Sequence, residues 1–233
     1  MRVLITSGGT TEPIDSVRGI SNFATGRLGA LTAERFLAAG HEVILLAGDK
    51  AALPKAEADD KLFVSKIMGT ADLYERMEQL VPRVDVVVHS MAVSDYRPVY
   101  MTGLENLPEM ISQEELLHFQ PDFAKKISSK SNHQIMLLEK TPKIISFIKE
   151  WNPKVVLFGF KLLAGVSQDE LLKVATDKLI SNHADYIVAN DLEKINAKEH
   201  HAFLVSADKV EELLTKEEIA EKILRTSEAH FHD

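Results

Sequence analysis

Two polar, glycine-rich clusters near the N-terminus contain residue types that suit the binding of an anion. The first is Ser7-Gly8-Gly9-Thr10, and the second is Asn22-Phe23-Ala24-Thr25-Gly26-Arg27-Leu28-Gly29. Glycine lets backbone N–H groups approach a phosphate or carboxylate, and hydroxyl side chains add further donors. The spacing matches neither G-x-G-x-x-G nor G-x-x-x-x-G-K-[ST], so neither a standard dinucleotide fingerprint nor a Walker loop is present.

The two clusters together favour a ligand loop over a simple turn. Taken alone, Gly8-Gly9 fits a tight turn as well as it fits a ligand loop. The second cluster, however, leads directly into a predicted helix, whose N-terminus carries unpaired N–H groups and a partial positive charge. Loops that meet at the carboxyl end of the first strand of an open α/β sheet lie where such sheets bind ligands.

The elements that must position these clusters alternate between strand and helix. Near-continuous apolar runs predict buried strands, which are expected at residues 2–8, 41–48, 84–90, 153–160 and 184–191. Amphipathic segments predict helices at residues 27–40, 70–82 (ending at Pro82), 143–151 (capped by Thr141), 168–180 and from Thr215, where a capping box begins. Residues 201–205 and 209–213 indicate a hairpin or adjacent strands. The predicted fold is a Rossmann-like, mainly parallel sheet flanked by helices.

One long segment lacks a clear period. Residues 95–140 mix proline, glycine, serine and charge, with only a short helical stretch at QEELL, so no ordered core is expected there. An insertion of this length is either a flexible linker or a functional lid. We therefore predict one domain over residues 1–233 with a flap at approximately 96–135.

Composition restricts the possible partners and location. The 233 residues carry a formal net charge of −8 and no cysteine, which argues against non-specific nucleic-acid or membrane binding and excludes disulfides and a thiolate nucleophile. No apolar run has the length of a membrane span or a secretory signal, so a cytoplasmic location is expected. The nine histidines are scattered, and a solvated surface is expected for them rather than a metal site.

The chain resembles the phosphopantothenate–cysteine ligase family in five ordered blocks. The first is VLITSGGTTEPIDSVRGISNFATGRLG; the others are Met91-Ala92-Val93-Ser94-Asp95-Tyr96, Lys126-Ile127, Gly159-Phe160-Lys161-Leu162 and Val188-Ala189-Asn190-Asp191. The blocks cover almost the whole length in the expected order. Many bacterial members carry a flavin-dependent decarboxylase half before this region. Because no such half precedes residue 1, the stand-alone form is expected, with a separate decarboxylase as its pathway partner.

The resemblance implies a two-step ligation in coenzyme A biosynthesis. The carboxylate of 4′-phosphopantothenate attacks the α-phosphate of a nucleotide, releasing pyrophosphate and leaving an acyl-nucleotidylate. The amine of cysteine then attacks the acyl group, forming the amide and releasing nucleoside monophosphate. The family uses CTP or ATP; the sequence favours CTP without deciding between them. A polyanionic substrate set also implies Mg²⁺.

The resemblance assigns the chemistry itself to two polar side chains. Asn22 matches a family asparagine that contacts the acyl group, where a neutral amide can hold the carbonyl oxygen for attack. The alternative is a cap for the helix at residue 27, but Asn22 lies several residues too early for that. Lys126 matches a flap lysine that stabilises the α-phosphate, and its alternative is a solvated surface lysine.

The remaining site positions also come from the family match. Ala92 and Asp95 match the substrate site, where Asp95 binds a substrate amide or hydroxyl, helps to hold Mg²⁺, or simply closes a turn. Arg18 matches an arginine that reaches the substrate phosphate in the other subunit, which implies a homodimer with a shared site. The nucleotide-contacting positions are Gly8, Ala24, Gly26, Gly29, Phe160, Lys161 and Asn190.

Several positions depart from the family pattern or allow a purely structural interpretation. Ala24 replaces a common serine, Met91 replaces a usual alanine, and Ile127-Ser128-Ser129 replaces the later lysines of the flap motif. A phenylalanine such as Phe160 is more often core than base platform. Lys161 is more informative, because a charge at the end of an apolar strand must reach solvent or an anion.

Two other function classes share parts of this pattern. A short-chain NAD(P)-dependent oxidoreductase would have the same half-sheet, but it needs a Tyr-x-x-x-Lys pair. No tyrosine of the chain (Tyr74, Tyr96, Tyr100, Tyr186) has a lysine four residues later. A non-catalytic nucleotide-binding regulator is the second alternative, favoured only by the missing flap lysines.

Overall fold

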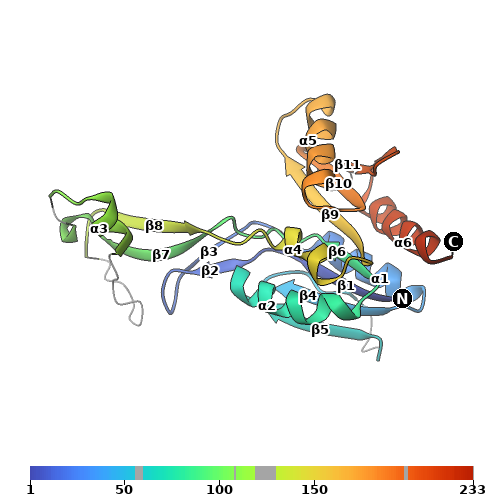
Figure 1. Ribbon diagram of the computed structural model, residues 1–233, viewed down its shortest axis with the longest axis horizontal. Coiled ribbons are helices and arrows are strands. Elements are labelled where there is room, and N and C mark those ends of the chain that lie inside the picture. The colour runs from blue at the N-terminus through green and yellow to red at the C-terminus, as the bar shows by residue number, and fades with distance from the viewer. Residues whose placement is uncertain (56–59, 108, 119–129, 197–198, 233) are drawn as a thin grey trace.

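The computed structural model describes residues 1–55, 60–107, 109–118, 130–196 and 199–232, and its centre is one eight-stranded sheet (Figure 1). The strand order is β12-β11-β10-β9-β6-β1-β4-β5. The six strands from β5 to β10 in this order are parallel, whereas β11 and β12 are antiparallel to their neighbours. The bounds are β1 Arg2–Ser7, β4 Glu42–Gly48, β5 Leu62–Ile67, β6 Val86–His89, β9 Val156–Leu163, β10 Tyr186–Ile195, β11 His200–Val205 and β12 Val210–Leu213.

Helices cover both faces of the sheet because its strands are apolar on both faces. Val3 and Ile5 of β1 point to the face covered by helices α1 and α6, whereas Leu4 points to the opposite face, covered by α2 and α4. Helix α5 packs on the far end of that second face against β10 and β11. The bounds are α1 Arg27–Ala38, α2 Thr70–Leu80, α4 Ile144–Trp151, α5 Gln168–Ser181 and α6 Lys216–His232. The predicted α/β fold with a mainly parallel sheet is confirmed.

Local signals located most of these elements to within a few residues. Thr215 caps α6 as predicted, since its hydroxyl oxygen accepts from the N–H of Glu218 at 3.1 Å. The predicted cap of α4 is wrong, because the Thr141 hydroxyl donates instead to the Ser94 carbonyl at 2.5 Å. Strand β5 was not predicted, since it lies at the sheet edge and its short apolar run is interrupted by Ser65 and the exposed Lys66.

The described parts of the segment 95–140, which are residues 95–107, 109–118 and 130–140, are more ordered than their sequence indicates. Strands β7 (Tyr96–Gly103) and β8 (Gln134–Lys140) form an antiparallel hairpin, with the short turn η2 (Leu104–Asn106) and helix α3 (Gln113–His118) at its tip. Tyr100 is fully buried and its hydroxyl donates to the Leu116 carbonyl at 3.2 Å. The expectation of no ordered core there is therefore wrong for the described part, because Tyr100 is buried where the hairpin meets α3, a pairing that local periodicity does not reveal.

A second hairpin, also not predicted, lies beside the first. Strands β2 (Thr11–Pro13) and β3 (Gly19–Ser21) pair antiparallel, and β2 contacts β7. In Figure 1 both hairpins project from the same side of the sheet. The carboxylate of Glu12 in β2 accepts from the backbone N–H of Thr70 at 2.7 Å and so fixes the base of this hairpin to the first turn of α2.

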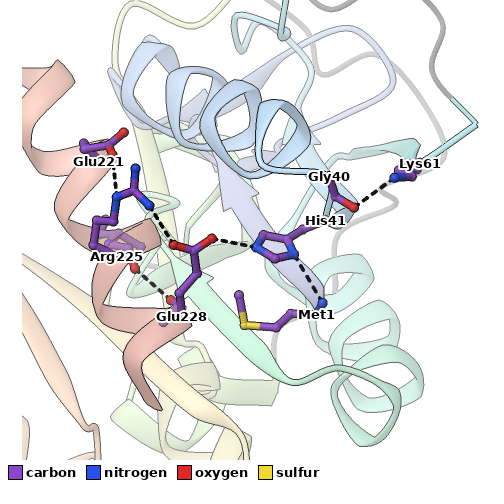
Figure 2. Close-up of polar contacts among 9 residues, drawn as sticks. Met1, Gly40, His41, Lys61, Glu221, Arg225 and Glu228 are labelled. Carbon is purple, nitrogen blue, oxygen red and sulfur yellow. Dashed lines mark hydrogen bonds and ion pairs between the residues drawn. The ribbon is translucent and has the colours of Figure 1, made fainter. Parts of the chain in front are cut away.

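A polar cluster fastens α6 to the face that it shares with α1 (Figure 2). His41, in the turn after α1, lies 3.3 Å from Glu228 through Nε2 and 3.3 Å from the Met1 amine through Nδ1. Arg225 holds the other oxygen of Glu228 at 3.1 Å and also Glu221 at 2.9 Å. This orientation of α6 keeps its first residue, Lys216, beside the pocket described below. None of the helices in the described ranges is long and apolar enough to cross a membrane.

Candidate functional site

A pocket of about 760 Å³ opens at the carboxyl ends of the parallel strands. Its walls come from the loops after β1 and β6, the N-terminal turns of α1 and α4, and the ends of β9 and β10. Nine of the positions predicted from sequence line it: Gly8, Ala24, Gly26, Gly29, Ala92, Asp95, Phe160, Lys161 and Asn190. This is the edge at which open α/β sheets bind ligands.

The first glycine cluster both turns the chain and lines the pocket. Gly8 has φ +82°, and a side chain there would place its Cβ 2.6 Å from that of Ala51. The loop is held to the segment after β6, because Ala92 donates to the Gly8 carbonyl at 2.8 Å and Thr10 donates to the Ala92 carbonyl at 3.1 Å. The two interpretations that the sequence left open are therefore compatible.

The second glycine cluster leaves the N-terminus of α1 uncapped. Gly26 occupies the N-cap position with φ +70° and has no side chain to cap the helix, the Thr25 hydroxyl accepts from the Arg27 N–H only at 3.5 Å, and the first turn contains no acidic residue. Gly29 packs so closely on Ser7 that a Cβ would overlap it. An uncapped, acid-free N-terminus beside a pocket has free N–H donors and a partial positive charge for an anion.

Asn22 lies just outside the pocket wall and fastens two of the wall residues. Its amide nitrogen donates to the Ala92 carbonyl at 2.9 Å and to the Ser94 hydroxyl at 3.3 Å. Thr10 completes this network, since its hydroxyl oxygen accepts from the Ser94 N–H at 2.9 Å. Both amide hydrogens of Asn22 are thus engaged by the protein. Gly26 rather than Asn22 occupies the N-cap of α1, so the capping alternative is excluded.

Cationic side chains outnumber carboxylates among the described residues that line the pocket, although the whole chain is acidic. Asp95 is the one carboxylate among the described lining residues, and Lys143 lies 3.4 Å from it in an exposed pair. Five cationic side chains line the pocket, namely Arg27, Lys143, Lys161, Lys178 and Lys216. Of these, only Lys143 forms an ion pair with a residue that the structure describes. The pocket is therefore a locally positive site in a chain of net charge −8.

Sequence reasoning missed four of these cations and two histidines. Lys178 and Lys216 lie on helices whose sequences resemble solvated amphipathic segments, and only the packing of α5 and α6 brings them to the pocket. His89 and His200 also line it. The sequence contained one signal for these residues: His89 ends an apolar strand, and the ends of such strands are where the pocket was predicted.

His89 forms part of the pocket floor as a neutral imidazole. Its Nδ1 lies 3.0 Å from the Thr6 hydroxyl, whose oxygen accepts from the Met91 N–H at 3.2 Å. Burial, as the larger cause, and the nearby charge of Lys143 together lower the pKa of His89 from 6.5 to about 4. His89 therefore fixes the turn after β6 without adding charge.

Phe160 lies both against the core and at the pocket wall. It is half-buried, packs against the core cluster beneath α1 and α6, and also lines the pocket. Asn190, across the β9–β10 ladder, is buried. The aromatic ring and the amide thus lie on adjacent strand ends of the same wall.

Two predicted site residues lie elsewhere. Arg18 is at the turn of the β2–β3 hairpin and does not line the pocket; its guanidinium binds the buried carboxylate of Asp15 at 2.6 Å. Lys126 lies outside the described residues, so its predicted role stays a prediction. Within those residues there is also no group of three His, Cys, Asp or Glu side chains that could hold a metal ion.

The fold and the pocket define an α/β protein whose cation-lined site lies at the carboxyl edge of a mainly parallel sheet. The chain belongs to the family described as the DNA/pantothenate metabolism flavoprotein C-terminal domain, whose profile matches residues 1–104 and 118–230.

Named relatives agree with the family predicted from the sequence blocks. The bifunctional coenzyme A biosynthesis protein CoaBC of Thermococcus kodakarensis is 32% identical over 95% of this chain and 49% of its own length. The phosphopantothenate–cysteine ligase of Mus musculus is 29% identical over 99% of this chain and 84% of its own length. The chain spans about half the length of the curated relatives that match it first.

A solved structure shares the whole fold. The crystal structure of the DNA/pantothenate metabolism flavoprotein from Streptococcus pneumoniae superposes with a TM-score of 0.93, at 47% identity, over 99% of each chain. The agreement includes the full sheet and the projecting segments, since almost no residue of either chain is left out.

Proposed function

We propose that this chain is a phosphopantothenate–cysteine ligase, which joins 4′-phosphopantothenate and L-cysteine through an acyl-nucleotidylate in coenzyme A biosynthesis. The observation that carries the proposal is the pocket itself: cations, an uncapped helix N-terminus and one carboxylate, in a strongly acidic chain. Both reactants of the first step are anions, so they need such a site to approach each other. The named relatives support the choice of substrates.

The nucleotide occupies the pocket, with its phosphates toward Gly8, Gly26 and the first turn of α1. Lys161 and the neighbouring cations offset the charge that the phosphates bring. Phe160 and Asn190 contact the base, and Ala24 lines the phosphate side of the pocket where the family commonly has a serine.

The acid substrate lies over Ala92 and Asp95, beside Asn22. Its carboxylate attacks the α-phosphate, and the bond from that phosphorus to pyrophosphate breaks. Asn22 then holds the acyl oxygen while the cysteine amine displaces nucleoside monophosphate. The 3.3 Å contact of Asn22 with Ser94 is the longer of its two, and it is the one exchanged for the substrate. Lys126 of the flap stabilises the charge on the α-phosphate.

Mg²⁺ fits this site as an ion that arrives with the nucleotide. Mg²⁺ is usually held by one or two carboxylates together with substrate phosphates, rather than by a protein cage. Asp95 at the pocket is one carboxylate that could take this part. When bound, the ion would neutralise the departing pyrophosphate.

The working unit is a homodimer in which Arg18 of one subunit serves the site of the other. The β2–β3 hairpin carries Arg18 away from its own pocket and exposes the apolar side chain of Val17 at its turn. A projecting hairpin with exposed apolar and cationic residues suits contact with a second copy. We further propose a cytoplasmic location and a separate decarboxylase that consumes the product.

A product assay tests the function. The protein is incubated with phosphopantothenate, cysteine, Mg²⁺ and either CTP or ATP, and pyrophosphate and the amide product are measured. We expect both to form in equal amounts, with one nucleotide preferred. Asn22→Asp should reduce amide formation more than nucleotide consumption. Nucleotide binding without pyrophosphate release would support the regulator alternative, and binding of NAD(P) alone would support the oxidoreductase.

A further inference from the structure

The far end of the pocket contains a histidine that the proposed reaction leaves without a role. His200 is the first residue of β11 and is 8% exposed, and its backbone N–H donates to the Leu214 carbonyl at 2.8 Å. Its side chain lines the pocket. The next residue, His201, is only half-buried and lies 3.7 Å from Glu212 of β12. The two neighbouring histidines therefore have different surroundings.

The imidazole of His200 is paired on one side only. Its Nε2 lies 3.4 Å from the side-chain amide nitrogen of Asn190, whereas its Nδ1 is buried and has no partner among the described residues. Because Asn190 has only donor hydrogens on its nitrogen, Nε2 must be the acceptor, and the proton of the neutral ring is on Nδ1.

The ring is neutral, so it can keep this acceptor role. Burial lowers the pKa of His200 from 6.5 to about 4, and the charge of Lys216 acts in the same direction. A charged imidazolium would have no acceptor to offer, and Asn190 would then turn its oxygen toward the ring. A neutral His200 instead keeps the amide nitrogen of Asn190 on its own side. The Asn190 carbonyl oxygen has no other partner within the described ranges and remains available at the pocket wall.

We infer that His200 is a positioning residue for nucleobase selection: it holds Asn190 so that the Asn190 carbonyl oxygen accepts a hydrogen bond from an exocyclic amino group. This inference rests on the proposed function, in which Asn190 and Phe160 contact the base. Cytosine and adenine have an amino group at the corresponding position, whereas uracil and guanine have a carbonyl oxygen there. An acceptor facing an acceptor leaves both unpaired, so the site discriminates against UTP and GTP.

Equilibrium binding measures this selectivity without turnover. Titration calorimetry with the Mg²⁺ complexes of CTP, UTP, ATP and GTP gives two matched ratios, CTP over UTP and ATP over GTP. We expect the preferred amino nucleotide to bind at least about tenfold more tightly than its carbonyl counterpart. In His200→Leu the ratio should fall to near one, because Asn190 is then free to present either end of its amide.

A rescue variant and a matched control separate positioning from a structural role. His200→Gln offers an amide oxygen to the Asn190 N–H, so it should retain most of the selectivity even if the leucine variant fails to fold. His201→Leu alters the neighbouring residue of the same strand and should leave the ratio unchanged. Circular dichroism checks that each variant is folded.

Three results would overturn the inference: no base preference in the wild type, an unchanged ratio in folded His200→Leu, or loss of the ratio in folded His200→Gln. Failure of the proposed function gives a different pattern. Selective binding that depends on His200, without formation of the amide product, supports the inference and contradicts the ligase. Formation of the product with equal affinity for CTP and UTP contradicts the inference alone.

Discussion

The sheet edge and the projecting hairpins obtain their order in different ways. Strands β1 and β6 are buried on both faces, so the loops that leave them are anchored by the core. The hairpins bury Tyr100 but also expose large side chains, such as Tyr96 at 55%, Val17 at 65% and Leu104 at 50%. Under the proposed function, the sheet edge would preform the nucleotide site, while the hairpins would need a substrate or a second copy to complete the acid site.

The largest expected effect comes from removing the tip of the β7–β8 hairpin. This change should reduce turnover while leaving nucleotide binding at the sheet edge nearly intact. We would replace residues 104–133 by an Asn-Gly turn between Gly103 and Gln134, which face each other across the β7–β8 ladder. Turnover should fall roughly a thousandfold because Lys126 is lost, whereas the affinity for nucleotide should change less than about threefold. Product formation and calorimetry measure the two quantities. Loss of nucleotide binding in a folded variant would show that the regions are not separable.

Mixing two inactive variants tests whether the hairpin serves a second copy. Arg18→Ala and Asn22→Asp should each reduce turnover by about a hundredfold, since one removes a phosphate contact and the other the acyl contact. If Arg18 acts across the dimer, an equal mixture with exchanged subunits should recover about a quarter of wild-type activity, because half of the dimers contain one intact site. If Arg18 acts within its own chain, no site is intact and no activity returns.

A single charge at the sheet edge should affect the nucleotide rather than the acid. Lys161→Gln removes a cation that lines the pocket without an ion-pair partner in the described chain. We expect KM for the nucleotide to rise about tenfold and KM for phosphopantothenate to stay nearly constant. Lys154→Gln, an exposed lysine just before the opposite end of β9, is the matched control. A rise in KM for the acid instead would place the acid, not the nucleotide, beside β9.

The smallest of the expected effects is the pH dependence of stability that arises from His89 in the pocket. The folded protein holds the pKa of His89 at about 4 against 6.5 in the unfolded chain, so the unfolded state takes up the proton first. Stability should therefore be lost as the pH falls from about 6.5 to about 4, by up to roughly 3 kcal/mol from this residue. His89→Asn should show a smaller loss in urea unfolding measured across that range. An equal loss would contradict neutral burial of His89.

The same contrast explains what the sequence can and cannot predict. The buried strands and the loop around Gly26 were predictable, because continuous apolar runs and glycine clusters are local signals. The β7–β8 hairpin was not, since the pairing of Tyr96 with Lys140 joins residues far apart in a segment of mixed polarity. The same holds for Lys178 and His200, which reach the pocket only through the packing of α5 and the pairing of β11.

Isotope tracing tests most directly the central claim that the pocket joins a carboxylate to a nucleotide before cysteine attacks. Phosphopantothenate labelled with ¹⁸O in its carboxylate is converted in the presence of cysteine, Mg²⁺ and the preferred nucleotide, and the products are weighed by mass spectrometry. The account predicts one labelled oxygen in the nucleoside monophosphate and none in pyrophosphate. Label in inorganic phosphate, or a nucleoside monophosphate without label, would contradict it.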